Sequence, residues 1–261
     1  MQSNAASRSA REAKVKALWR QRRDPAPWAA ALAAAPARAA RPSAGARLAA
    51  KPELDEFYFE RLPQQLLLKS PSTNPLAALT NGELAAVVEW KLARGTWRPR
   101  LLDFAKAARQ SDVAAAAAAA AEALEAGEVG AAVDALCVLK GVGPATATAL
   151  LSAADPSIPF LSDEALVAVL GAREYSKPAA LRVTEALRER AAELNEQQQE
   201  RQQQRQQQEG EEKGGSVDWT ASKVERALWS ASRAEDDEKE GDAGEEEEEA
   251  SVEKKKKRKL R

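Results

Sequence analysis

The residue types that could bind or transform a ligand are concentrated in two short blocks of the chain. The first block, residues 139–147, reads LKGVGPATA and lies between two apolar segments. Gly141 and Gly143 can adopt backbone conformations that other residues avoid, and Pro144 suits the first turn of a helix, where its missing N–H has no partner to lose. The block therefore predicts a tight hairpin between two helices. Its free N–H groups would point outward and could bind one phosphate oxygen of a DNA backbone.

The hairpin supplies both backbone and side-chain candidates for this contact. The expected donors are the backbone N–H groups of the two glycines and of Ala145, assisted by the side chains of Lys140 and Thr146. The alternative is an ordinary connection between two helices, in which the glycines only fit the turn. Two glycines followed by a helix-starting proline favour the binding interpretation. The predicted DNA contacts in this block are Lys140, Gly141, Val142, Gly143, Ala145 and Thr146.

The second block, residues 160–164, reads FLSDE and places a carboxylate, Asp163, at the expected start of a new helix. Its distance from the hairpin is fixed, because Asp163 follows Gly141 by 22 residues. One interpretation is that Asp163 takes part in chemistry beside the hairpin. The other is that Asp163 or Ser162 caps the helix N-terminus, which typically stabilises a helix by about 1 kcal/mol.

Together the two blocks resemble the helix–hairpin–helix motif of the DNA glycosylase superfamily, which has the endonuclease III-like fold. In that family an L-P-G-V-G-x-K-T-A hairpin precedes a catalytic aspartate at this spacing. The resemblance implies that Asp163 faces a flipped nucleotide and either stabilises positive charge on the sugar or activates water. The blocks at residues 141–147 and 160–164, together with the basic block at residues 90–99, also resemble a group of uncharacterised eukaryotic proteins. That likeness covers about residues 52–232 and implies no activity.

Three departures from the family pattern narrow the implied chemistry. Ala145 stands where bifunctional members carry a Schiff-base lysine, so no lyase step through an amine is expected. Glu164-Ala-Leu follows the aspartate instead of T-H-V, and Ala168 stands at the family's arginine position. The cysteines of an iron–sulfur cluster are absent, because Cys137 is the only cysteine. The resemblance therefore implies either a monofunctional glycosylase or a binding protein that has lost catalysis.

A basic block, residues 90–99, is the third candidate site and reads WKLARGTWRP. Lys91, Arg94 and Arg98 are predicted to contact phosphates, while Trp90 or Trp97 could stack on a base. The alternative is that the tryptophans belong to the core and that the bases form a solvated rim.

Composition excludes several other classes of site. The chain of 261 residues has no histidine and one cysteine, which removes disulfides, histidine-based catalysis and zinc–cysteine sites. No cofactor and no metal ion are expected. No window approaches the roughly 18 apolar residues of a membrane span, so no membrane contact is expected either.

Helical periodicity and capping signals predict an all-α protein with a glycosylase-like helical domain and disordered tails. Capping boxes are predicted at Thr80–Glu83 and Ser222–Glu225, and a helix near residues 54–62 is predicted to end at Pro63. Residues 1–50 carry 10 basic and 2 acidic side chains and are expected to be a disordered arm. The expected parts are a domain at 51–195, a Gln-rich linker or solvated helix at 196–215, a docking helix at 216–233 and a disordered tail at 234–261.

Two functions from different classes follow. The first is a nuclear, monomeric protein that binds double-stranded DNA and carries out monofunctional base excision. The second is a non-enzymatic adaptor on DNA or chromatin. A purely structural helical domain is the third alternative. Residues 254–261 (KKKKRKLR) predict recognition by a nuclear import receptor, whereas the basic N-terminus leaves an organelle transit peptide as the alternative location.

Overall fold

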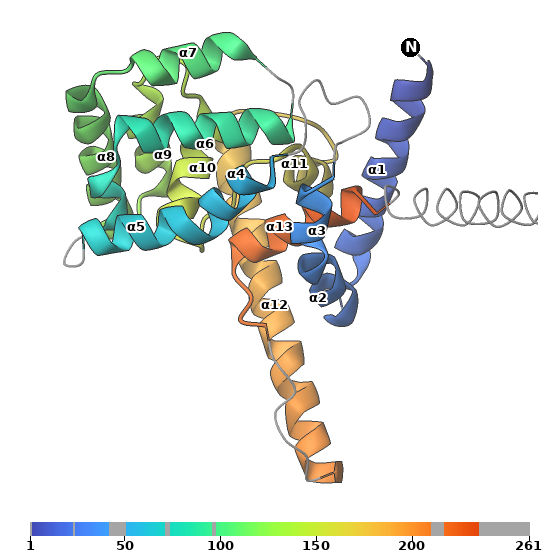
Figure 1. Ribbon diagram of the computed structural model, residues 1–261. Coiled ribbons are helices and arrows are strands. Elements are labelled where there is room, and N and C mark those ends of the chain that lie inside the picture. The colour runs from blue at the N-terminus through green and yellow to red at the C-terminus, as the bar shows by residue number, and fades with distance from the viewer. Residues whose placement is uncertain are drawn as a thin grey trace, which may run out of the picture.

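A computed structural model of the protein describes residues 2–22, 24–41, 51–70, 74–95, 98–209 and 217–234. The regular secondary structure in these ranges is entirely helical, so the all-α prediction is confirmed (Figure 1). No described helix combines the length and the apolar character needed to cross a lipid bilayer. The predicted import signal and the acidic run before it lie outside the described residues.

The N-terminal segment differs from the expected disordered arm, because its described part is helical. It forms α1 (Gln2–Arg20), α2 (Ala26–Ala33) and α3 (Ala35–Ala39). Val15 and Trp28 are buried, and Trp28 packs edge to face against Trp19 and Trp219, with ring centroids 6.3 and 6.5 Å away. Tryptophans that look isolated in the sequence therefore share one core with the C-terminal segment, and their burial orders the arm.

One side of the helical body is built from the first half of the chain after the arm. In chain order it contains α4 (Pro52–Glu56), the π-helix η1 (Phe57–Arg61), α5 (Leu62–Lys69), the 3₁₀-helix η2 (Pro75–Ala78), α6 (Asn81–Arg94), α7 (Pro99–Ala107) and α8 (Gln110–Glu125). The capping box of α6 is confirmed, because Thr80 accepts from the Glu83 N–H and the Glu83 side chain accepts from the Thr80 N–H. The helix predicted to end at Pro63 does not end there. Pro63 lies in the first turn of α5, where a backbone N–H is not needed, and the helical backbone continues through it.

The centre of the body consists of α9 (Val129–Cys137), α10 (Pro144–Ala154) and α11 (Asp163–Leu170). Alanines on one face of α8, including Ala117 and Ala120, are fully buried and let α8 pack closely on α9. Nine of the eleven residues of α10 are buried, from Ala145 to Ala153. The hairpin between α9 and α10 is therefore anchored on a helix that is almost wholly inside the protein.

The C-terminal part of the described chain consists of α12 (Lys177–Glu209) and α13 (Ala221–Ser232). Helix α12 projects out of the body in Figure 1, and its helical conformation continues through most of the Gln-rich segment that was expected to be a linker or a solvated helix. Helix α13 packs against α1, α2, α11 and α12. Its N-cap is Thr220, which accepts from the Lys223 N–H, so the predicted capping box at Ser222 is wrong.

Candidate functional site: the hairpin and the start of helix α11

The hairpin connects α9 to α10 through one left-handed residue, Gly141, whose φ is +85°. Gly143 is extended, with φ −113° and ψ 179°, and forms the N-cap of α10. The Gly143 carbonyl accepts hydrogen bonds from the N–H groups of Thr146 and Ala147 at 2.8 and 2.9 Å. The Val142 N–H donates to the Leu139 carbonyl at 3.0 Å and closes the turn.

Gly141 and Gly143 differ in whether the structure would tolerate a side chain at that position. A Cβ atom on Gly141 would lie 3.0 Å from Phe104 Cδ2 and 3.2 Å from Phe104 Cβ, and the positive φ already disfavours any other residue. A Cβ atom on Gly143 would meet nothing within 4 Å. The fold therefore demands glycine at position 141 but not at position 143, where the space beside the backbone is open.

The hydrogen bonds of the turn decide which predicted contacts are available. The N–H groups of Gly141, Gly143 and Ala145 donate to no other residue that the structure describes. The N–H groups of Val142 and Thr146 are bonded within the turn, and the Thr146 side chain is only 3% exposed. Val142 and Thr146 are therefore parts of the core rather than contacts for a ligand, which corrects the prediction for these two residues.

Lys140 and the start of α7 place positive charge beside these N–H groups. The Lys140 side chain is exposed, and its Nζ lies 4.4 Å from the centroid of the Phe104 ring. Arg98 is exposed at the N-cap of α7. Burial lowers the pKa of Lys91 and the nearby Arg98 lowers it further, while Asp163 acts in the opposite direction. Lys91 thus lies within electrostatic reach of both α7 and the start of α11.

Arg94 does not belong to this surface, and its prediction as a DNA contact is corrected. Its side chain is only 7% exposed and donates through Nε and Nη2 to Asp55 Oδ1 at 3.2 and 3.0 Å. Its guanidinium carbon lies 3.9 Å from the centroid of the Trp229 ring and 4.7 Å from that of Trp90. Trp90 is itself buried and stacks on Tyr58 with ring centroids 3.5 Å apart. The last turn of α6 therefore directs Arg94 into the core, whereas the described residues leave Arg98 outside.

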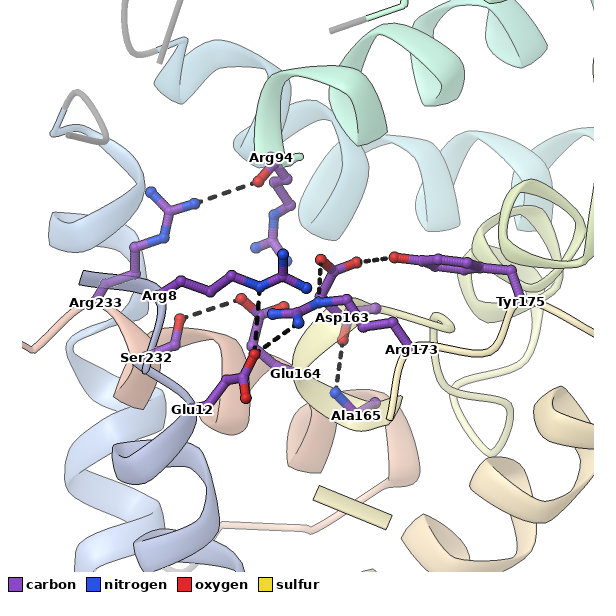
Figure 2. Close-up of polar contacts among 11 residues, drawn as sticks. Arg8, Glu12, Arg94, Asp163, Glu164, Ala165, Arg173, Tyr175, Ser232 and Arg233 are labelled. Carbon is purple, nitrogen blue, oxygen red and sulfur yellow. Dashed lines mark hydrogen bonds and ion pairs between the residues drawn. The ribbon is translucent and has the colours of Figure 1, made fainter. Parts of the chain in front are cut away.

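Asp163 stands at the first position of α11, and Ser162 is the cap: the Ser162 hydroxyl accepts from the Ala165 N–H at 3.1 Å. The Asp163 side chain is 51% exposed and is held by two donors (Figure 2). Arg173 Nε donates to Oδ2 at 2.8 Å, and the Tyr175 hydroxyl donates to Oδ1. Burial raises the pKa of Tyr175, and the bond to Asp163 raises it further, so the phenol keeps its proton and remains a donor.

Arg173 also ties the N-terminal arm to this carboxylate. Its Nη1 donates to Glu12 Oε1 of α1 at 2.6 Å while its Nε binds Asp163. Both salt bridges are partly exposed. No signal in the sequence linked Glu12 to this site, because its contact with Arg173 joins residues 161 positions apart.

Glu164, next to Asp163, points the other way in Figure 2 and enters a buried polar cluster. The Ser232 hydroxyl donates to Glu164 Oε1 at 3.2 Å, and burial raises the pKa of Glu164. Burial also raises the pKa of Glu225, on α13, to about 7. Arg233 is the main compensating cation for Glu164, and Arg94 is the main one for Glu225. These two carboxylates hold α13 against α11, a role that sequence reasoning missed because it depends on which side of each helix faces the core.

The structure thus brings most of the predicted contacts toward one region of the molecule. Lys91 lies within electrostatic reach of Arg98 and Asp163, and both Lys140 and Gly141 lie beside Phe104 of α7. The predicted contacts that lie in the core are Arg94, Val142 and Thr146. Among the described residues, no three acidic or thiol side chains come together as metal ligands. No protein-family model, no curated protein and no solved structure matches this chain.

Proposed function

We propose that this protein binds double-stranded DNA by holding one backbone phosphate at the hairpin. The main support for the proposal is that three backbone N–H groups of the turn donate no hydrogen bond to a described residue. The N–H groups of Gly141, Gly143 and Ala145 have no acceptor among the described residues, and the space beside Gly143 is open. Free N–H groups at a helix N-terminus attract an anion, and a residue without a side chain lets a foreign backbone approach.

The charges around the hairpin support the same proposal. Lys140, Lys91 and Arg98 make no ion pair with any described residue, whereas Lys51 and Lys69 are bonded to Glu89 and Glu83 at 2.6 and 2.7 Å. Three cations that meet phosphates would give a slope of log K against log salt of about −3, at roughly −0.9 per contact.

The test is the variant Gly143→Asp, measured by fluorescence anisotropy with a short labelled duplex. The open space and extended backbone accommodate the new side chain, and aspartate is a favourable N-cap, so the domain is expected to stay folded. The carboxylate would accept from the N–H groups of the first turn of α10 and repel phosphate. We expect the dissociation constant to rise about tenfold or more, which corresponds to roughly 1.4 kcal/mol.

A matched control is Ala192→Asp, which adds the same charge at an exposed position of α12. This variant should bind DNA like the unmodified protein. Equal affinity of folded Gly143→Asp and Ala192→Asp would refute phosphate binding at the hairpin.

Base excision is a second candidate function, because Ser162 performs the capping and leaves the Asp163 carboxylate half exposed at the start of α11. In this reaction water adds to C1′ of the sugar, the bond from C1′ to the base nitrogen breaks, and the base leaves with a proton. The carboxylate would stabilise the positive charge on the sugar. Ala145 supplies no amine for a lyase step, so the product would be an abasic site with an intact backbone.

This candidate is tested by incubating excess protein with duplexes that carry damaged or mismatched bases and then cleaving abasic sites with alkali. Base release by the protein and by Tyr175→Phe, but not by Asp163→Asn, would support a monofunctional glycosylase. No release across a broad panel by a protein that binds DNA would instead support the non-enzymatic adaptor.

Nuclear location is proposed from residues 254–261 alone. A fluorescent fusion should accumulate in nuclei, and replacement of the basic residues of this octet by alanine should abolish the accumulation. Accumulation in an organelle would instead support the transit-peptide alternative.

A further inference from the structure

The face of α7 beside the hairpin carries cations that no acidic side chain neutralises. Lys140 Nζ lies 4.4 Å from the centroid of the Phe104 ring, and the Arg100 guanidinium carbon lies 5.8 Å from the same centroid. The Phe104 ring therefore makes cation–π contacts with two positive charges, Lys140 from the hairpin and Arg100 from α7. Neither Lys140 nor Arg100 makes an ion pair with a described residue, and both are exposed.

The hairpin packs directly against α7. Gly141 lies so close to α7 that an added Cβ would meet Phe104 at 3.0 Å and Leu101 at 3.6 Å. Leu102, on the same helix, is buried in the core. A ligand that binds the hairpin backbone thus has α7 as its immediate neighbour.

The first residues of α7 extend this positive charge away from the hairpin. Arg98 is exposed at the N-cap, two residues before Arg100. Burial is the main cause of the lowered pKa of Lys91, and the like charge of Arg98 lowers it further, against the opposite effect of Asp163. Asp103, the acidic residue of α7, is exposed and forms no ion pair with Arg100. Like charges that lie close together cost free energy, which a bound polyanion would relieve.

We propose that α7 is the second half of the DNA-contacting surface, in which Arg98 and Arg100 bind a further phosphate of the duplex that the hairpin holds. The inference rests on the proposed function and adds a residue, Arg100, and an element, α7, that the hairpin motif does not include. Two separated phosphate contacts fix the register of the duplex as well as its affinity.

The test is the double variant Arg98→Gln/Arg100→Gln, assayed with the full-length protein and a short duplex over a range of salt concentrations. Because each lost phosphate contact changes the slope of log K against log salt by about 0.9, the slope should become shallower by about 2. The matched control, Arg61→Gln/Arg182→Gln, removes the same charge from η1 and α12 and should leave the slope unchanged. Arg100→Lys keeps the charge and should keep the slope.

The outcomes separate this inference from the proposed function. No duplex binding by the unmodified protein would overturn both. A normal slope in the folded double variant, together with weakened binding by Gly143→Asp, would overturn the role of α7 and leave the hairpin proposal intact. An equal loss in the control variant would also overturn the inference, because it would show an effect of net charge. Tighter binding to duplex RNA than to duplex DNA would overturn the choice of partner.

Discussion

The unfolding free energies of Gly141→Ala and Gly143→Ala should show which hairpin glycine the fold requires and which one is free to serve a ligand. In Gly141→Ala, a non-glycine residue must adopt φ +85°, at a cost of about 1–2 kcal/mol. Its Cβ must also push against Phe104 at 3.0 and 3.2 Å, which costs about 1–3 kcal/mol because Phe104 is fixed to α7. Alanine also lowers the conformational entropy of the unfolded chain, which stabilises the folded state by only about 0.4–1 kcal/mol. The net loss of unfolding free energy is therefore roughly 1–5 kcal/mol.

Gly143→Ala should behave differently, although it is only two residues away. The extended backbone and the open space impose no strain. Alanine is a poorer N-cap than glycine, but it also reduces the freedom of the unfolded chain, and these effects have opposite signs. The net change should stay within about 0.5 kcal/mol.

Urea unfolding followed by circular dichroism measures both variants on the full-length protein. We expect a clearly lower midpoint for Gly141→Ala and an unchanged midpoint for Gly143→Ala. If Gly143→Ala were destabilised as much as Gly141→Ala, both glycines would serve the fold and the argument for an open ligand site at Gly143 would fail.

Three further predictions concern the polar groups around α11. Because burial raises the pKa of Glu225 from 4.5 to about 7, the folded protein holds a proton that the unfolded chain releases, and stability should fall between about pH 4.5 and 7 by roughly 3 kcal/mol. Glu225→Gln should make this fall smaller in urea titrations at about pH 5 and pH 8, leaving the part due to Glu164, whose pKa burial also raises; an equally steep fall in the variant would contradict the assignment. Ser162→Ala should lower the unfolding free energy by about 1 kcal/mol because Ala165 loses its capping acceptor, and an unchanged thermal midpoint would argue against it. Arg94→Ala should destabilise by about 3 kcal/mol, since the buried Asp55 would lose its closer arginine partner and keep only Arg226, whose Nη2 lies 3.5 Å from Oδ2, and a folded Arg94→Gln variant with a shallower salt slope would restore Arg94 as a DNA contact.

Local signals in the sequence were sufficient where a neighbour in the chain decides the structure. The Thr80–Glu83 capping box formed as expected, since both hydrogen bonds close within one helical turn. A helix starts at Pro144 and another at Asp163 for the same reason. The capping signal at Ser222 failed because Thr220, two residues earlier, offers an equally good hydroxyl and its use allows Ser222 to bond Ser152 at 3.0 Å.

Contacts between distant segments decided the rest. Arg94 and Arg98 are equally basic in the sequence, and only the packing of α13 under the last turn of α6 determines that Arg94 meets Trp229. The ordering of the N-terminal arm depends on Trp28 meeting Trp219 across 191 residues, which no local pattern reveals. The ion pair of Asp163 with Arg173 could not be predicted either, because it depends on how the loop after α11 folds back.

The central claim, that the hairpin holds a DNA phosphate through its backbone N–H groups, is tested most directly by NMR of the amide protons during titration with duplex DNA. We expect the amide signals of Gly141, Gly143 and Ala145 to show the largest downfield shifts, because these N–H groups would gain a charged acceptor. Saturable binding that leaves these three signals unmoved while other residues shift would contradict it.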